Sequence, residues 1–194
     1  MIPVKRSPEP SQFDTKCRKA GKAWLKLQAR PLAGRPKDYW SQFRPDLCNA
    51  FKSICAYEAL FIGAGGGCVD HFEPVSNTKL IYEWSNYRYA NARVNSRKGI
   101  RGSADILDPF EVRPGWFEIL LPSLQMRVTD RVPAPKRARA EATLRLLGLD
   151  HHEQVVASRA EFYRLYREGK LSLEALREWA PLIAEAIDNE QLAR

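Results

Sequence analysis

The run Gly63-Ala64-Gly65-Gly66-Gly67 near the middle of the chain constrains the fold more than any other stretch. Glycine favours turns and is a poor helix former, so we expect no regular helix across these five residues. An apolar pair, Cys68-Val69, follows at once, and then Asp70 and His71. A short apolar segment bounded by helix breakers is typical of a strand. We therefore expect a short strand here, with an acid and a histidine near its end.

Periodic apolar spacing on both sides of this segment predicts helices. Apolar residues three and four positions apart predict a helix from Ser11 to about Gln28, and one or two more before Tyr57. A link rich in helix breakers is expected at residues 29–36. A second strand is expected at Ser85–Tyr89, followed by a helix from about Asn91 to Lys98 that is closed by Gly99. Two further strands are expected on either side of Pro122-Ser123. Helices are expected from about residue 135 onward, and of these one opens with an Asp150 cap and the last with a Ser172 cap.

Strands in the middle of the chain with helices on both sides predict an α+β fold. We divide the chain into an N-terminal helical arm at residues 1–57, a central unit at 58–104, and a strand pair with C-terminal helices at 105–194. The three parts are expected to form one compact unit. A length of 194 residues and a hydrophobic fraction of 44% are ordinary for such a globular domain.

Several classes of protein are excluded by what the chain lacks. No apolar stretch approaches the roughly eighteen residues that span a bilayer, and the first residues have no apolar core of a secretory signal. The four cysteines form no Cys-x-x-Cys pair. We therefore expect a cytoplasmic protein with reduced thiols and no membrane partner. There is no Walker-type phosphate loop, dinucleotide fingerprint or Gly-x-Ser-x-Gly elbow.

The net charge of +8 favours polyanionic partners such as nucleic acids, although many soluble proteins are mildly basic. The positive charge is concentrated between Asn86 and Gly102, a segment without any acid. This local excess predicts contacts with a nucleic-acid backbone, and an ordinary solvated helix face is the alternative. The arginines expected to bind nucleic acid are Arg88, Arg93, Arg97 and Arg101.

Five polar residues in the central unit follow a fixed spacing. Asp70 and His71 are adjacent, Asn86 comes fifteen positions after His71, Asn95 nine positions later, and Lys98 three after that. A histidine with a near-neutral pKa can take a proton from water, and carboxylate and amide oxygens are ligands for a hard divalent ion. Hydrolysis of a phosphodiester needs an activated water and stabilisation of the charge in the transition state, which these two functions can supply.

This pattern resembles the HNH endonuclease family, whose motif is a ββα unit built around a metal ion. The resemblance covers about thirty residues: the Asp-His pair, the proline shortly after it, Trp-Ser-Asn at 84–86, and Asn-x-x-Lys-Gly at 95–99. It implies a ββα-metal core with His71 as the general base, Asp70 and Asn95 as ligands of Mg²⁺ or Mn²⁺, and Lys98 as a phosphate contact. Asn86 would hold the loop between the strands and help to orient His71.

Two features depart from the family pattern. Many members carry two Cys-x-x-Cys pairs around a structural zinc, and these positions correspond here to Cys55 and Glu58, and to Asn91 and Val94. No structural zinc is therefore expected, and packing of Tyr57, Tyr82 and Trp84 would hold the scaffold instead. The last ligand is Asn95, where many members have histidine, which favours Mg²⁺ over zinc or nickel.

The resemblance implies a metal-dependent endonuclease that hydrolyses DNA, in a phage-defence or mobile-element context. The size and layout also resemble small bacterial and phage HNH proteins, some of which work beside an ATPase. The expected partners are DNA, an ATPase or another protein, and a second copy of the chain in a homodimer. An RNA-directed nuclease and a non-catalytic nucleic-acid-binding module stay open as alternatives. The roles of Glu73 and Asp108, near the metal or in ordinary turn and surface positions, are also left open.

Overall fold

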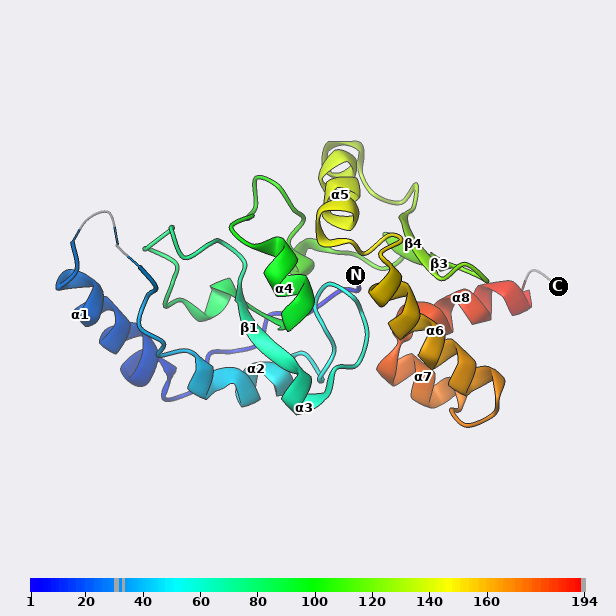
Figure 1. The fold of residues 1–194 in the computed structure, drawn as a ribbon, viewed down its shortest axis with the longest axis horizontal. Helices are drawn as coiled ribbons and strands as arrows, with labels where there is room; N and C mark the ends of the chain where they lie inside the picture. The colour runs from blue at the N-terminus through cyan, green and yellow to red at the C-terminus, as the bar shows by residue number, and fades with distance from the viewer. Residues whose placement is uncertain (30–31, 33, 193–194) are drawn as a thin grey trace.

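The computed structural model describes residues 1–29, 32 and 34–192, and its fold mixes helices with two small antiparallel sheets, as the α+β expectation requires (Figure 1). Residues 30, 31 and 33 of the expected link, and residue 193 of the expected last helix, lie outside the described residues. None of the helices in the described part of the chain has both the length and the apolarity needed to cross a bilayer.

The first sheet pairs β1 (Gly67–His71) with β2 (Tyr87–Asn91). The register places Gly67 opposite Asn91 at one end and His71 opposite Tyr87 at the other. Gly67 is required because a Cβ atom there would lie 2.1 Å from the ring of Tyr89. Both strands lie within about two residues of their expected positions.

Helix α4 (Ala92–Lys98) begins directly after β2 and completes a strand–strand–helix unit. The Asn91 side chain caps it by accepting a hydrogen bond from the backbone N–H of Arg93 at 2.9 Å. Gly99 ends the helix with a φ of 56°, a conformation that glycine adopts without a steric penalty. This helix matches the expectation from the sequence.

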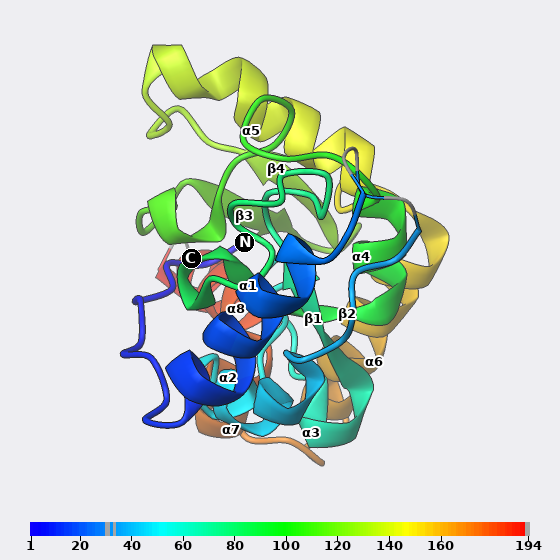
Figure 2. The ribbon, with the colours of Figure 1, turned by 90° about the vertical axis from the view of Figure 1, so that its left-hand side faces the viewer.

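The N-terminal part lies along one side of this unit (Figure 2). Its first helix runs through a π-helical segment, Asp14–Lys19, into α1 (Ala20–Lys26), and a 3-10 turn at Ser41–Phe43 leads into α2 (Arg44–Ala50). Phe13 packs against the rings of Phe43 and Trp84 with centroids 5.0 and 5.5 Å away. The contact with Trp84 joins the arm to the start of the Trp-Ser-Asn turn, a 3-10 turn at Trp84–Asn86.

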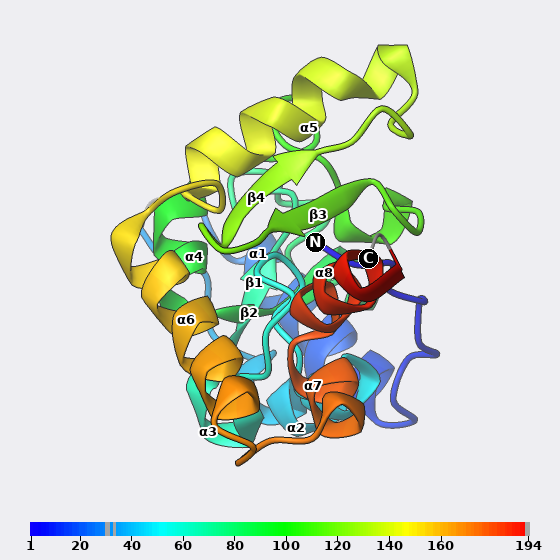
Figure 3. The ribbon, with the colours of Figure 1, turned by 90° about the vertical axis from the view of Figure 1, so that its right-hand side faces the viewer.

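The second sheet pairs β3 (Phe117–Leu120) with β4 (Gln125–Val128), as expected, after a 3-10 turn at Pro109–Glu111. Four helices follow it: α5 (Ala134–Leu147), α6 (Glu153–Arg167), α7 (Leu173–Trp179) and α8 (Pro181–Leu192). Helix α5 packs on β4 and α8 packs on β3, which places this hairpin between the two helices (Figure 3). The buried apolar residues form one cluster that extends from the first residues to α8.

Three expectations about local structure were wrong. Gly63–Gly66 forms one helical turn, α3, instead of an open loop. The cap of α6 is His152, whose ring accepts the Gln154 N–H at 3.3 Å, instead of Asp150. The last expected helix is two helices, since Ala180 leaves the helical conformation before Pro181. Its Ser172 cap is confirmed by a bond of 3.1 Å from the Ala175 N–H.

Candidate active site

His71 lies at the end of β1 with its ring held from three sides. Its Nε2 atom is 3.0 Å from the carbonyl oxygen of Ile81. The rings of Trp40 and Tyr87 pack edge-on against it, with centroids 4.6 and 5.0 Å away. A carbonyl oxygen can only accept, so Nε2 carries the hydrogen and Nδ1 keeps a lone pair.

The protonation state of His71 follows from its surroundings. Burial lowers its pKa to about 4, because desolvation disfavours the charged imidazolium more than the neighbouring Asp70 carboxylate favours it. The imidazole is therefore neutral at physiological pH. The Tyr87 hydroxyl donates to the same Ile81 carbonyl at 2.8 Å, which fixes that acceptor in place.

Asp70 lies one residue earlier, beneath α4, and is 1% exposed. Its Oδ2 atom accepts a hydrogen bond from the Tyr57 hydroxyl at 2.6 Å, and its Oδ1 atom is 3.0 Å from the ammonium group of Lys98. Burial raises the pKa of the Tyr57 phenol, and the neighbouring Asp70 carboxylate raises it further. The charge of Asp70 is thus balanced inside the protein.

Lys98 is the last residue of α4, and its side chain reaches back under the helix. Its ammonium group donates to the carbonyl oxygen of His71 at 2.6 Å as well as contacting Asp70, and the residue is fully buried. The expected phosphate contact is therefore not available in this conformation, because the ammonium group faces the protein interior.

Asn86 clasps the connection between the two strands. Its Oδ1 accepts the Glu73 N–H at 2.7 Å, and its Nδ2 donates to the carbonyl oxygens of Glu73 and Leu80 at 3.0 and 3.1 Å. Leu80 precedes Ile81, whose carbonyl holds the His71 ring. Asn86 therefore acts on the histidine through the loop and not by direct contact.

Asn95 and Asp70 lie on the same side of β1. The Asn95 Nδ2 donates to the sulfur of Cys68 at 3.3 Å, and Cys68 shares a face with Asp70 because strand side chains alternate. Their oxygens are of the type that Mg²⁺ and Mn²⁺ prefer, so the donor chemistry fits such an ion. An ion on Oδ1 of Asp70 would repel the ammonium group already there, so Lys98 would have to leave.

The four arginines differ in what they can reach. Arg88 is 2% exposed, and its guanidinium forms a two-bond pair with Asp108 at 2.8 and 2.9 Å. In this conformation Arg88 cannot reach a nucleic acid, because its side chain is buried in the core and its guanidinium lies over the ring of Phe110. Arg93 is exposed at the first turn of α4.

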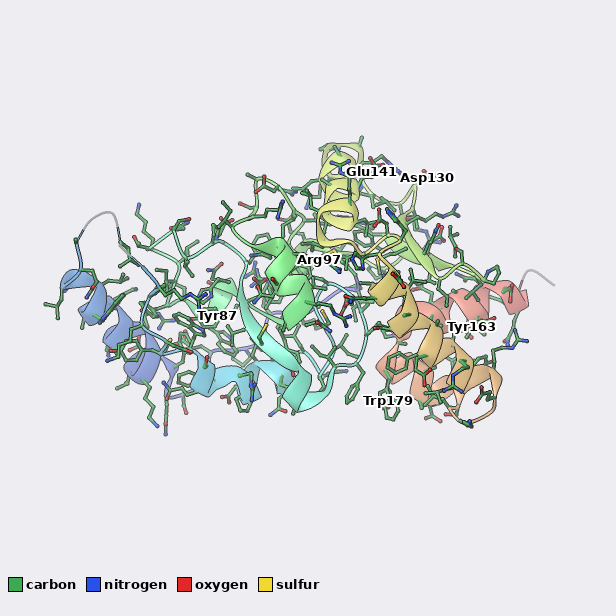
Figure 4. All side chains as sticks on the ribbon, in the orientation of Figure 1. Tyr87, Arg97, Asp130, Glu141, Tyr163 and Trp179 are labelled. Carbon is green, nitrogen blue, oxygen red and sulfur yellow. The ribbon has the colours of Figure 1, made fainter. Side chains whose placement is uncertain are left out.

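The other two arginines are half-buried. Arg97 points from α4 toward the connection between α5 and α6, where it contacts the ring of His152 at 2.7 Å (Figure 4). Arg101 donates to the carbonyl oxygen of Arg97 at 2.8 Å and so closes the end of α4. The structure therefore exposes only Arg93 fully among the four expected contacts.

Asp108 and Glu73, whose roles the sequence left open, both make contacts that hold the fold together. Asp108 binds Arg88 and caps the turn at Pro109–Glu111 by accepting the Phe110 N–H at 3.0 Å. Glu73 accepts the Ser103 N–H at 3.0 Å, which ties the strand connection to the segment after α4.

Sequence reasoning did not identify three groups that contact the site: the Tyr57 hydroxyl, the Trp40 ring and the Ile81 carbonyl. Tyr57 was expected only as a packing residue, and it is fully buried as that expectation required. An aromatic residue before a glycine run carries no signal for a bond to a particular carboxylate. A backbone carbonyl has no sequence signal at all.

The positions where many HNH proteins hold zinc also meet in space. The Cys55 sulfur accepts the N–H groups of Glu58 and Asn91 at 3.5 and 3.3 Å. Burial raises the pKa of this thiol to about 12, so it carries its proton. The two loops that a metal would join are here held by a neutral sulfur.

No protein-family model matches the sequence, and no curated protein matches it significantly.

Proposed function

We propose that this protein is a metal-dependent endonuclease of the HNH type that hydrolyses phosphodiester bonds in DNA. One observation carries the proposal. The chain folds into a β1–β2–α4 unit in which His71, with its tautomer set by a backbone carbonyl, directly follows Asp70 at the end of β1. The Asp70 carboxylate lies beneath the helix that bears Asn95 and Lys98, and the His71 ring leaves the opposite face of the strand.

His71 would act as the general base through Nδ1. Its Nε2 hydrogen is committed to Ile81, so the lone pair of Nδ1 is the one able to accept a proton from water. The lowered pKa keeps this lone pair free at neutral pH, at the cost of a weaker base. Trp40 and Tyr87 hold the ring so that the orientation of Nδ1 does not change.

Asp70 and Asn95 would hold Mg²⁺ or Mn²⁺, which supplies positive charge for the transition state and the leaving oxygen. For this, Lys98 must release Oδ1 of Asp70, and its ammonium group then becomes available to a phosphate. Tyr57 would keep its bond to Oδ2 and so hold the carboxylate in position. Asn86 is a positioning residue in this scheme, because it acts through the loop that carries Ile81.

The test is cleavage of supercoiled plasmid at neutral pH with Mg²⁺ or Mn²⁺, with a chelator as the metal-free reaction. We compare the native chain with His71→Ala and with His151→Ala, an exposed histidine that serves as the matched control. The proposal expects nicking that requires metal, is lost in His71→Ala and persists in His151→Ala.

Two results would contradict the proposal. Cleavage that survives in His71→Ala removes the general base from the scheme. A protein that binds plasmid in a salt-sensitive way but never cuts it is instead the non-catalytic binding module. Cleavage of an RNA duplex or single strand in place of plasmid would keep the chemistry and change the substrate.

A further inference from the structure

An open pocket of about 610 Å³ lies between α6 and the end of the β1–β2 hairpin that is far from His71. Its lining comes from segments distant in the sequence, which include Gly66 just before β1, Asn91 at the end of β2, and α6 from Gln154 to Phe162. The side chains used below are Glu58, Phe61, Arg93 and Phe162. None of them is among the residues assigned above to catalysis or metal binding, and Arg93 is one of the expected nucleic-acid contacts.

Glu58 is the most informative residue of this pocket. It is 2% exposed, and no hydrogen-bond donor in the described part of the chain reaches its Oε1 atom. A buried acceptor without a donor costs about 1–3 kcal/mol, so such atoms are rare unless a ligand or water completes them. A molecule bound in the pocket can supply the missing donor once the Glu58 side chain turns Oε1 toward it, because this atom has almost no accessible surface in the free protein.

The other lining side chains point to an aromatic ligand attached to a phosphate. Phe61 is 38% exposed and stacks with Trp179 at 5.5 Å, and Phe162 is half-buried on α6 (Figure 4 labels Trp179). Exposed aromatic rings stack on nucleobases whatever the sequence of the nucleic acid. Arg93 is exposed at the rim and can pair with a phosphate.

The distance from the candidate active site also fits a nucleic acid. The pocket begins where Gly67 pairs with Asn91, and His71 is four strand residues away. At a rise of about 3.3 Å per residue this is roughly 13 Å, or about four base steps along duplex DNA. A strand whose phosphate lies at His71 can therefore place a nearby nucleotide at the pocket.

We propose that this pocket binds an unpaired nucleobase that carries an exocyclic amine, with the amine donating to Oε1 of Glu58 and the adjacent phosphate paired with Arg93. The inference rests on the proposed function only in taking nucleic acid as the substrate. Cytosine, adenine and guanine each offer an exocyclic N–H₂ group to a carboxyl oxygen. Thymine offers its N3–H only between two carbonyl oxygens, which the carboxylate repels.

The test compares two pyrimidine oligonucleotides of equal length, oligo(dC) and oligo(dT), by fluorescence anisotropy at neutral pH with a chelator. The native chain should bind oligo(dC) about tenfold more tightly, the ratio that one hydrogen bond of about 1.4 kcal/mol gives. Glu58→Gln should remove most of this preference. Glu174→Gln, which deletes the same charge from an exposed position on α7, should keep it.

Equal binding of oligo(dC) and oligo(dT) by the native chain would overturn the inference, and that comparison needs no variant to fold. A preference that survives in a folded Glu58→Gln, checked by thermal unfolding, would overturn it as well. Because the measurement is made with a chelator, it does not depend on cleavage. A chain that prefers oligo(dC) but never nicks plasmid would thus refute the endonuclease and keep the pocket.

Discussion

The ammonium group of Lys98 lies 3.0 Å from the carboxylate of Asp70, and both side chains are shielded from solvent. The contact joins the last residue of α4 to the end of β1, so it closes the strand–strand–helix unit from inside. Neither charge would be tolerated there alone, since an unpaired charge in a protein interior is strongly unfavourable. This pair therefore links the stability of the unit to the chemistry of the candidate site.

Replacing Lys98 with methionine should lower the free energy of unfolding by about 3–5 kcal/mol, because Asp70 is left buried without its cation. The double variant Asp70→Asn, Lys98→Met should recover most of this loss. Urea unfolding monitored by tryptophan fluorescence measures both. The matched control is Arg164→Met, which breaks two exposed ion pairs, with Glu161 and Glu168, and should leave the unfolding curve close to that of the native chain. A Lys98→Met loss as small as the control's would show that the pair is not buried in solution.

Substitution of Arg88 should lower the stability of the protein, whereas substitution of Arg93 should weaken its binding to nucleic acid. Arg88→Met leaves Asp108 buried without its partner and should cost about 3–5 kcal/mol of unfolding free energy. Arg93→Ala should change stability by less than about 0.5 kcal/mol. Titration of plasmid binding at several salt concentrations should show that Arg93→Ala reduces the salt slope by about one. An unchanged slope would remove Arg93 from the interface.

Asn86→Ala should loosen the connection between β1 and β2. It removes three hydrogen bonds and leaves the Glu73 N–H without its acceptor, so the loss should be about 2–4 kcal/mol. Hydrogen–deuterium exchange at the Glu73 amide should become faster. Asn77→Ala, in the same connection, is the control and should cost less than about 1 kcal/mol. Unchanged protection of the Glu73 amide would contradict the clasp.

The buried imidazole of His71 makes stability depend on pH. Its pKa is about 4 in the folded protein and near 6.5 in the unfolded chain, so between these values the unfolded state binds the extra proton. The free energy of unfolding of the metal-free protein should therefore fall as the pH decreases from about 7 to 4, by on the order of 3 kcal/mol from this group.

His71→Gln should remove that part of the pH dependence, and His151→Gln, at an exposed position, should not. Urea unfolding at pH 7, 5.5 and 4.5, with a chelator present, measures the free energy of unfolding of the native chain and the two variants. If the free energy of unfolding changes with pH equally in the native chain and in His71→Gln, the His71 imidazole is exposed to solvent.

Local signals in the sequence were sufficient for the elements of the central unit. The Asp-His segment, the second strand and the helix closed by Gly99 all form near their expected positions, because strand and helix ends depend on residues close in the chain. The glycine run was an exception. Gly63–Gly66 forms a helical turn, and the hydroxyl of Tyr89, a residue from the neighbouring strand, donates to the Gly63 carbonyl. A distant contact there outweighs the low helix propensity of glycine.

The sequence by itself determined which chemical groups the central unit carries and their order along two strands and a helix. Only the tertiary structure decided which of these groups face each other. Lys98 and Arg88 read alike as positive charges beside a candidate site, yet each is buried against an acid, because residues brought from elsewhere in the chain exclude water around them. Arg93 stays exposed on the same helix as Lys98. Burial and partner choice are properties of the packed chain, and local spacing does not encode them.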